Sequence, residues 1–346
     1  MSNVPPLATI FNPERRRFLR NSALLSLGLA VSGTVMPSIA RAASTQIRIA
    51  TNPGLENATL TALLHQQGFL RRFDADVRFV EAPGTRGPFD AIVAGEADLC
   101  MVSGYNGLLS RIEQGARVKI VGAGMRKTAL TVFARPGEVR TLADLQGKTM
   151  AVGPSMGLLR VLMQQLLNDR SIDPGAVHFV DKGGNDECYQ AVVNGEADAC
   201  CASVSHLDDP CGLVVVRDAN LWESLPRYTF QTAYAADSAL RDKHQGIVAV
   251  MAAYGALYEY LMTPAAEGAF FDARRKADKS FDEQGAQAMW RFIQTQQPWS
   301  RDLSLTPDDI AYQQDMYMQQ GILRHKQAYA AVADMSAAKA AAQWSG

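Results

Sequence analysis

Short apolar runs alternate with amphipathic segments in the first part of the chain. The runs at 46–50, 77–81 and 118–123 have the length of buried strands, and the segments 58–66 and 88–94 between them have helical spacing. Strands that alternate with helices in this way predict an α/β fold whose lobes each hold a mainly parallel sheet flanked by helices. The pattern therefore favours a globular protein built around buried sheets.

A second series of strands and helices follows a break at Arg135-Pro136-Gly137, which we interpret as a crossing between two lobes. Beyond Ser238 the pattern is almost entirely helical, and we expect most of these helices to pack on the first lobe. We predict a first lobe from residues 43–136 and 226–346 and a second lobe from residues 137–225. The run at 131–134 is expected to be the last strand before the break. After it we expect strands at 149–152, 177–180 and 213–216, helices at 142–145, 158–167 and 187–193, and a strand at 228–234 that leads back out of the second lobe.

An internal repeat supports this division into two lobes. The segment Ala91–Ser103 contains G-E-A-D and returns as Ala191–Ser203, again with G-E-A-D. The offset of about 100 residues is too long for a solenoid repeat and fits a duplicated domain. Each copy reads as a helix end, a glycine turn and a buried strand that ends in serine. The two lobes are thus predicted to share one topology.

The first 42 residues have the organisation of an export signal. A basic cluster, E-R-R-R-F-L-R at 14–20, precedes a mildly apolar run at 22–36 and the sequence Ala40-Arg41-Ala42. An apolar run of about 15 residues is shorter than the roughly 20 needed to span a bilayer, so we predict a cleaved signal of the twin-arginine type. The alternative, a basic leader retained in the cytosol, is less favoured because of the cleavage site. No cysteine stands there for lipid attachment, so we expect a soluble periplasmic product.

Charge and composition exclude several classes of function. The formal net charge is −1, and it becomes about −5 without residues 1–42, which argues against a nucleic-acid partner. After residue 42 no apolar run reaches 18 residues, so no further membrane segment is expected. Motifs of serine hydrolases, zinc proteases and phosphate-binding loops are absent from the sequence. We therefore predict no catalytic residue, metal or cofactor, and a monomer that is not an enzyme.

Five cysteines, an odd number, leave at least one thiol without a partner inside the chain. Cys100 and Cys200 lie in apolar strand-like runs and are expected to be core residues. A disulfide between Cys201 and Cys211 remains an open alternative. The spacing does not predict a zinc site, since no closely spaced set of cysteines and histidines occurs.

Candidate ligand contacts follow the predicted strands. In open parallel sheets, ligands bind beyond the carboxyl ends of the strands. In the first lobe these positions are Asn52, Ser103, Tyr105 and Asn106, and in the second lobe they are Ser155, Met156, Gly157, Gly184, Asn185 and Ser203.

The loop at 153–157 is the strongest of these candidates, because a helix start with free N–H groups attracts an anion. The alternative is that Ser155 only caps its own helix. Tyr105 and Asn106 would offer a ring face and an amide, although glycine–asparagine loops are also ordinary turns. His206 is interpreted as an exposed loop residue.

These motifs resemble the nitrate, sulfonate and taurine group of periplasmic ABC-transporter binding proteins, the NMT1/THI5-like group. The resemblance rests on the leader, V-A-G-E-A-D before a serine, A-V-G-P-S-M-G before a helix, and N-G-E-A-D-A one lobe later. It implies two lobes of the type II periplasmic binding protein fold that close on a small anion, and an inner-membrane permease as partner. By the same resemblance, Ser155, Met156 and Gly157 are contacts at the helix start, and Asn52, Ser103 and Tyr105 contact the ligand from the first lobe.

Departures from the family pattern and related functions leave the ligand open. Pro154 and Met156 interrupt the usual Gly-Ser start, and an apolar Met156 suits an organic anion better than nitrate. The thiamine-pyrimidine branch of the fold, with precursor binding or synthesis, is an alternative suggested by Cys200-Cys201, but its longer cysteine run and its lysine are missing. A ligand sensor that signals through a membrane receptor is a further alternative, which sequence alone does not separate from uptake.

Overall fold

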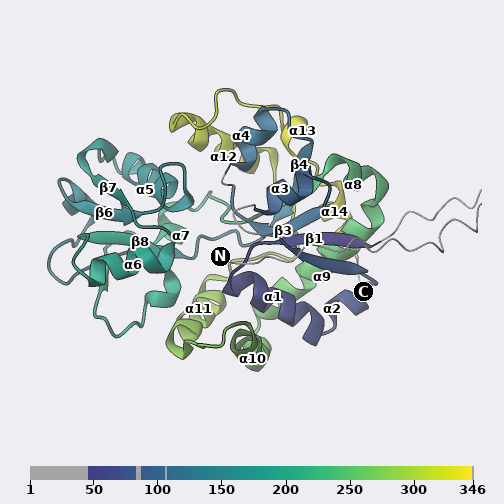
Figure 1. The fold of residues 1–346 in the computed structure, drawn as a ribbon, viewed down its shortest axis with the longest axis horizontal. Coiled ribbons are helices and arrows are strands. Elements are labelled where there is room, and N and C mark those ends of the chain that lie inside the picture. The colour runs from purple at the N-terminus through teal and green to yellow at the C-terminus, as the bar shows by residue number, and fades with distance from the viewer. Residues whose placement is uncertain (1–45, 83–86, 106, 345–346) are drawn as a thin grey trace, which may run out of the picture. The chain divides into compact units, whose positions relative to one another are not determined.

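The computed structural model describes residues 46–82, 87–105 and 107–344, and its strands form two five-stranded sheets (Figure 1). The first sheet has the order β2-β1-β3-β10-β4 and the second the order β7-β6-β8-β5-β9. The expected leader, residues 1–42, lies outside the described residues. The strands of the first sheet are β1 (Ile47–Thr51), β2 (Val77–Glu81), β3 (Leu99–Ser103), β4 (Val118–Ala123) and β10 (Thr232–Ala236). Those of the second are β5 (Leu130–Ala134), β6 (Thr149–Val152), β7 (His178–Asp181), β8 (Ala199–Ser203) and β9 (Val214–Val215).

Both sheets have the same topology, which confirms the prediction of two similar, mainly parallel sheets. In each sheet one strand runs antiparallel to its neighbours: β10 lies between β3 and β4, and β5 lies between β8 and β9. These two strands are the ones that the chain enters immediately after it leaves the other sheet. In each sheet, the antiparallel strand is thus the first one that the chain forms after it crosses from the other sheet.

The position of the first crossing differs from the prediction. Strand β5 belongs to the second sheet, so the chain crosses between Ala123 and Leu130 and not at Arg135–Gly137. Arg135 is instead held against the second sheet, because its guanidinium donates to the carbonyls of Val192 and Ala197 at 3.0 and 3.1 Å. The Pro-Gly turn therefore follows a strand of the second sheet and does not link the lobes.

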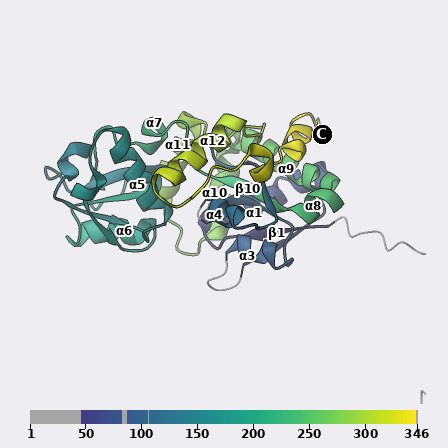
Figure 2. The ribbon, with the colours of Figure 1, turned by 90° about the horizontal axis from the view of Figure 1, so that it is seen from above.

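Helices cover both sheets, and the C-terminal part is helical as predicted. Viewed from above, α5 and α6 lie at the opposite end of the molecule from α8 and α9 (Figure 2). The helices before β10 are α1 (Leu55–Gln66), α2 (Phe69–Arg72), α3 (Pro88–Val93), α4 (Leu108–Glu113), α5 (Leu158–Asp169), α6 (Asn185–Val193) and α7 (Leu221–Ser224), with 3₁₀ turns η2 (Leu142–Leu145), η3 (Pro174–Ala176) and η4 (Val204–His206). Those after β10 are α8 (Asp237–Asp242), α9 (His244–Leu261), α10 (Glu267–Ala277), α11 (Glu283–Gln296), α12 (Pro307–Gln319), α13 (Tyr329–Val332) and α14 (Ser336–Ala342), with the 3₁₀ turn η5 (Pro264–Ala266) between α9 and α10.

Burial explains why these apolar runs form strands. Every residue of β5 is buried, and so is every residue of β3 and β8 except the final serine, as expected for strands with both faces covered. Helix α9 packs against α14 and α2 and buries most of its side chains, and α10 packs on α1. Helix α11 also contacts η4, which belongs to the second-sheet segment.

The two copies of the repeat form the same structure, a helix followed by a strand. Gly95 and Gly195 have φ of 73° and 77°, a conformation that glycine adopts without strain. The next residue in each copy, Glu96 or Glu196, donates its N–H back to the last helical turn at 2.9 or 2.8 Å, which is the Schellman ending of a helix. The predicted glycine turn between helix and strand is therefore confirmed in both copies.

The aspartate of each G-E-A-D motif fixes the neighbouring parallel strand. Asp98 accepts the N–H of Arg48 in β1 at 2.9 Å, and Asp198 accepts the N–H of Thr149 in β6 at 2.7 Å. The backbone N–H of each aspartate returns a bond to the carbonyl of the same residue. The repeat thus specifies strand register in both sheets.

No single helix among the described residues is long and apolar enough to cross a membrane. One pair, His244–Leu261 with Pro264–Ala277, reaches the required length and composition only together and is bent by 100°.

Candidate functional site

The predicted contacts of the second lobe lie along one edge of its sheet. Strands β6, β7 and β8 are parallel neighbours, so their carboxyl ends meet at the same edge. The loops after β6 and β7 touch, since a Cβ at Gly153 would lie 3.0 Å from the Gly183 carbonyl oxygen. The loop with Ser155, Met156 and Gly157 therefore lies beside the loop with Gly184 and Asn185.

The loop before α5 is exposed and carries a hydroxyl, that of Ser155, with no hydrogen bond to any residue that the structure describes. Gly157 is the N-cap of α5 and no side chain caps this helix, so the alternative that Ser155 caps it is wrong. The Gly157 N–H bonds to the Pro154 carbonyl at 2.7 Å and closes a turn that leaves Ser155 and Met156 exposed, the latter by 65%. The first turn of α5 has no acidic residue. A hydroxyl, an apolar side chain and a helix start thus face solvent together.

The start of α6 is less suited to an anion. Gly184 is its N-cap, and the Gly184 N–H already donates to the Glu187 carboxylate at 3.0 Å. Asp186 also lies in the first turn of this helix. Two carboxylates here repel a second negative charge, so the anion site that the helix starts predict is better placed at α5. Asn185 is exposed beside them.

Ser203 and His206 are held by local contacts. The Ser203 hydroxyl accepts the Ser205 N–H at 3.2 Å and caps η4. The interpretation of His206 as an exposed loop residue is wrong, because its ring stacks on Tyr189 with centroids 4.0 Å apart and one ring nitrogen lies 3.0 Å from Asp186. That contact lowers the pKa of Asp186 through its hydrogen bond to His206.

A pocket of about 440 Å³ opens at the carboxyl ends of β1 and β2. Thr51 and Glu81 are paired there across the two strands. The predicted Asn52 lies in the wall together with the first turns of α1 and Lys276 of α10. The Lys276 ammonium has no ion pair with any described residue, so it offers a positive charge to a ligand. Sequence reasoning missed Lys276 because it lies on a helix far along the chain, with no motif around it.

The remaining predicted contacts of the first lobe differ from one another. Ser103 ends β3 opposite Thr232 of β10 and is half-buried. Tyr105 is fully buried, with its ring 6.3 Å from that of Tyr228, so the expected exposed ring face is wrong. Burial raises the pKa of Tyr105, as expected for a phenol inside the lobe. Asn106 lies outside the described residues.

The two segments that cross between the sheets run side by side. The Gly124 N–H donates to the Gln231 carbonyl at 3.0 Å, and the Gln231 N–H donates to the Met125 carbonyl at 2.8 Å. The Gln231 side chain adds a third bond, because its Oε1 accepts the Met125 N–H at 3.0 Å. The two crossings are therefore tied to each other by three hydrogen bonds, and no local sequence pattern around Gln231 indicates this pairing.

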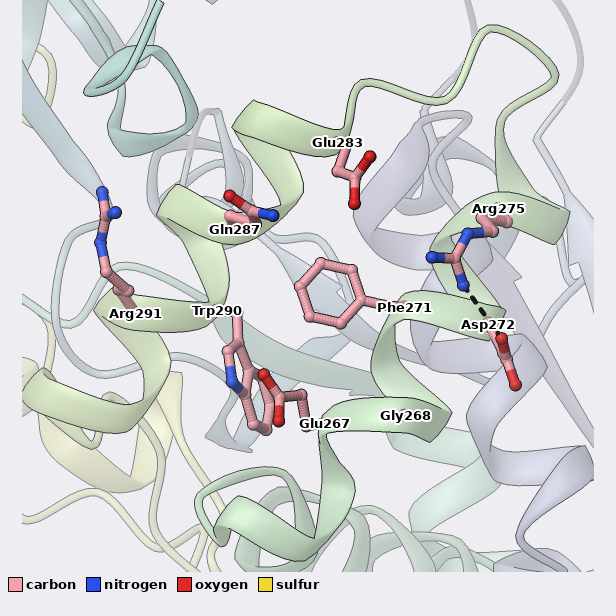
Figure 3. Close-up of a pocket in the computed structure, with 9 residues that line it drawn as sticks. All are labelled: Glu267, Gly268, Phe271, Asp272, Arg275, Glu283, Gln287, Trp290 and Arg291. Atoms are coloured by element: carbon pink, nitrogen blue, oxygen red, sulfur yellow. Dashed lines mark hydrogen bonds and ion pairs between the residues drawn. The ribbon is translucent and has the colours of Figure 1, made fainter.

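A larger hollow of about 540 Å³ lies between α10 and α11, and none of its lining residues follows a strand (Figure 3). The Phe271 ring points between the two helices, and Arg275 pairs with Asp272 at 3.1 Å. Arg291, which also lines it, pairs with Asp208 near η4. Both arginines in the wall of this hollow thus already have acidic partners, so we place the candidate site at the strand ends.

The cysteines take no part in the candidate site. All five are free, so the alternative of a Cys201–Cys211 disulfide is wrong: Cys201 is buried within β8, whereas Cys211 is exposed. Burial raises the pKa of Cys100 to about 12 and that of Cys188 to about 11, so both thiols stay protonated at neutral pH. No cluster of three histidine, cysteine or acidic side chains that could hold a metal occurs within residues 46–82, 87–105 and 107–344.

Comparisons with known proteins agree with the described architecture. A family model described as NMT1/THI5 like matches residues 57–266. Among curated protein sequences, none matches this chain. The solved alkanesulfonate-binding protein SsuA of Xanthomonas axonopodis pv. citri, bound to MOPS, is 18% identical with a TM-score of 0.66, over 83% of this chain and 98% of its own. This similarity confirms the predicted periplasmic binding protein fold.

Two further solved structures show the range of functions on this fold. The ligand-binding component of an ABC-type import system from Staphylococcus aureus is 15% identical with a TM-score of 0.64, and the match covers 85% of this chain and 98% of that one. The desulfurization enzyme DSZB is 14% identical with a TM-score of 0.60, and the match covers 86% and 98%. At such identities the fold is shared, and the site must be argued from its own residues.

Proposed function

Because the chain belongs to the NMT1/THI5-like family, we propose that it is the substrate-binding component of an ABC-type import system. The observation that carries this proposal is the pair of similar sheets, each with polar residues at the carboxyl ends of its parallel strands, joined by two hydrogen-bonded crossings. A solved protein of the same fold has this role in an import system. The arrangement supports capture of a small molecule between two lobes.

The ligand class that we propose is a small organic anion, such as a sulfonate, a taurine-like compound or an aromatic acid. Support comes from the acid-free start of α5 with the unused Ser155 hydroxyl, and from the unpaired Lys276 at the ends of β1 and β2. The exposed Met156 offers an apolar contact to the organic part. A solved protein of the fold is named for binding alkanesulfonates.

The mechanism that we propose is closure driven by the ligand. A ligand that contacts both strand-end edges binds the shut arrangement better than the open one, and that difference in affinity shifts the population. The paired segments at Gly124–Met125 and Gln231 would bend while each sheet stays rigid. Residues Ser203, Gly184 and Asn185 then line the edge of the second lobe, with Asn52 and Ser103 opposite.

The cellular setting follows from the leader and the family resemblance. We propose export by the twin-arginine machinery, residence in the periplasm as a monomer, and delivery of the ligand to an inner-membrane permease. The division into a first lobe of residues 43–136 plus 226–346 and a second lobe of residues 137–225 stays a prediction. Because β5 belongs to the second sheet, its residues 130–134 go with the second lobe instead of the first.

A catalytic role is the main competing function, since DSZB shows that this fold also supports an enzyme. The cysteines of the described residues argue against a thiol-based catalytic role in this protein. Four of them are buried, and the hydrogen bond from the exposed Cys211 to Asp209 raises the pKa of that thiol. A thiamine-pyrimidine protein and a sensor of the same ligand are the two remaining candidate functions, and the ligand screen below addresses the first of them.

A thermal-shift screen of the purified protein tests this proposal. The panel would contain nitrate, sulfate, taurine, alkyl and aryl sulfonates, aromatic carboxylates and thiamine pyrimidines. A ligand at 100 times its Kd should add about 2.7 kcal/mol to the free energy of unfolding. A shift with organic anions supports the proposed class, whereas a shift with pyrimidines alone would move the protein to the thiamine branch.

Replacement of the Ser155 hydroxyl tests the position of the site. We expect Ser155→Ala to weaken binding of the anion found in the screen by about 1–3 kcal/mol, measured by calorimetry, because a hydrogen bond to a charged acceptor is lost. Ser280→Ala, between α10 and α11, is the matched control and should bind normally. Equal affinities of the two variants would remove Ser155 from the site.

A further inference from the structure

A second, smaller cavity lies inside the first lobe, between α1, α10 and α11. Its volume is about 30 Å³, and apolar side chains form most of its wall. One water needs roughly 10–15 Å³ measured in this way, so the space takes two or three waters, about the bulk of a small carboxylate. None of the residues predicted from the strand ends lines it.

A buried charge without a hydrogen-bond partner faces this cavity. Arg274 of α10 is 8% exposed, and its Nε has no hydrogen-bond partner within the described part of the chain. Its guanidinium lies over the Phe270 ring at 5.7 Å, which satisfies none of its N–H groups. An ion taken out of water at this depth is costly unless its donors find acceptors.

A second donor without a partner lines the same cavity. Trp299 is 6% exposed, and its Nε1 has no hydrogen-bond partner among the residues that the structure describes. The indole stacks on Tyr258 with centroids 5.3 Å apart and planes 8° apart, so its orientation is fixed. Two N–H donors of different type therefore border one small space, and an acceptor is the complementary ligand.

Glu56 of α1 is the acid in the cavity wall. Its carboxylate accepts the Gln231 Nε2 hydrogen at 2.8 Å. Burial raises the pKa of Glu56, against the opposite effects of the Gln231 hydrogen bond and of Arg274. Its carboxyl is thus protonated more readily than an exposed one, and in that form it donates a hydrogen bond to an incoming anion.

We propose that this cavity binds a carboxylate of one to three carbons, with its oxygens on Arg274 and Trp299 and its alkyl end against Leu60, Leu63 and Phe270. The charge of Arg274 selects an anion, and the two donors match the two oxygens of a carboxylate. The apolar wall and the small volume exclude larger or doubly charged anions. The site is separate from the strand-end site and is formed within the first lobe.

Titration of the full-length protein with sodium acetate, against sodium chloride of equal ionic strength, tests this inference by melting temperature and calorimetry. We expect saturable binding that Arg274→Met weakens at least tenfold. Arg275→Met removes the same charge from the exposed neighbour on α10 and should leave the affinity unchanged. Equal acetate affinities of these two variants, or no saturable binding to the parent, overturn the inference.

Two further variants keep the test decisive if Arg274→Met does not fold. Trp299→Phe removes one donor and should weaken acetate binding about threefold to tenfold. Glu56→Gln keeps a hydrogen-bond donor at this position without a carboxylate charge that repels acetate, and should strengthen binding. Unchanged affinity in both variants contradicts the site. If the organic anion found in the screen displaces acetate, acetate binds at the strand ends. That result would also overturn the inference of a second site, while it leaves the proposed function intact.

Discussion

Asp98 and Asp198 occupy equivalent positions in the two copies of the repeat but differ in their electrostatic surroundings. Asp98 is 4% exposed and pairs with Arg48 at 2.7 Å and with Lys243 at 2.9 Å. Burial alone would raise the pKa of Asp98, but the hydrogen bonds from Arg48 and Lys243 outweigh it and hold the pKa below its ordinary value. Asp198 is more exposed, and its nearest cations lie at 3.8 and 4.0 Å.

We therefore expect Asp98→Asn to lower the free energy of unfolding by about 2–4 kcal/mol, because two cations lose a buried partner. Asp198→Asn is the matched variant and should cost about 1 kcal/mol, since its ion pairs are long and partly exposed. Urea unfolding of both variants measures the difference. A larger loss for Asp198→Asn would contradict this account.

The contribution of the Asp98 ion pairs to the free energy of unfolding also depends on pH. A folded-state pKa below the unfolded value means that the stabilisation is fully present above about pH 4 and is lost as the pH falls through the lowered pKa. The stability difference between the parent and Asp98→Asn should therefore shrink on acidification below pH 4. The same unfolding series, repeated between pH 3 and 7, measures it.

At the scale of single residues, sequence indicated the loops of the candidate site but not the side chains that packing brings near them from other parts of the chain. Asn52, Ser103 and the loop at 153–157 could be predicted because strand ends follow from the apolar runs. Lys276 in the pocket wall and Gln231 in the crossing could not, since only tertiary packing sets their positions. Tyr105 has the composition of a contact residue but is buried by its neighbours.

At the scale of elements, the two helix-ending glycines can be tested as a pair. Gly95→Ala and Gly195→Ala should each cost about 1 kcal/mol, because alanine at positive φ is strained while its Cβ would meet no clash: nothing lies near it at Gly95, and at Gly195 the nearest atom is Arg135 Nη1 at 3.8 Å. Gly268→Ala in α10, also in open space but without a positive φ, should stabilise the protein by about 0.5–1 kcal/mol. Thermal unfolding of the three variants measures both signs, and equal effects would contradict the argument.

The elements themselves were largely predictable. Strands with both faces covered are continuous apolar runs, which is why β3, β5 and β8 stand out in the sequence. Assignment of β5 to a sheet failed, because an apolar run carries no information on which sheet it joins. The pairing of β5 with β8 and β9 decides that.

At the scale of the whole molecule, the fold shields four of its five thiols from solvent. With four buried cysteines and the exposed Cys211, a thiol reagent such as dithionitrobenzoate should modify one thiol in the native protein and five after denaturation without reductant. The raised pKa of Cys211 makes that reaction slower than with free cysteine at the same pH. A count of three after denaturation would reveal a disulfide.

The position of β10 sets an order for folding during synthesis. This strand lies between β3 and β4, yet it leaves the ribosome only after every strand of the second sheet has been made. The second sheet is one continuous stretch of chain, from Leu130 to Val215, and can close as soon as it emerges. The strands made first must wait with an open gap in their sheet, so the first sheet is the last to finish folding although its synthesis begins first.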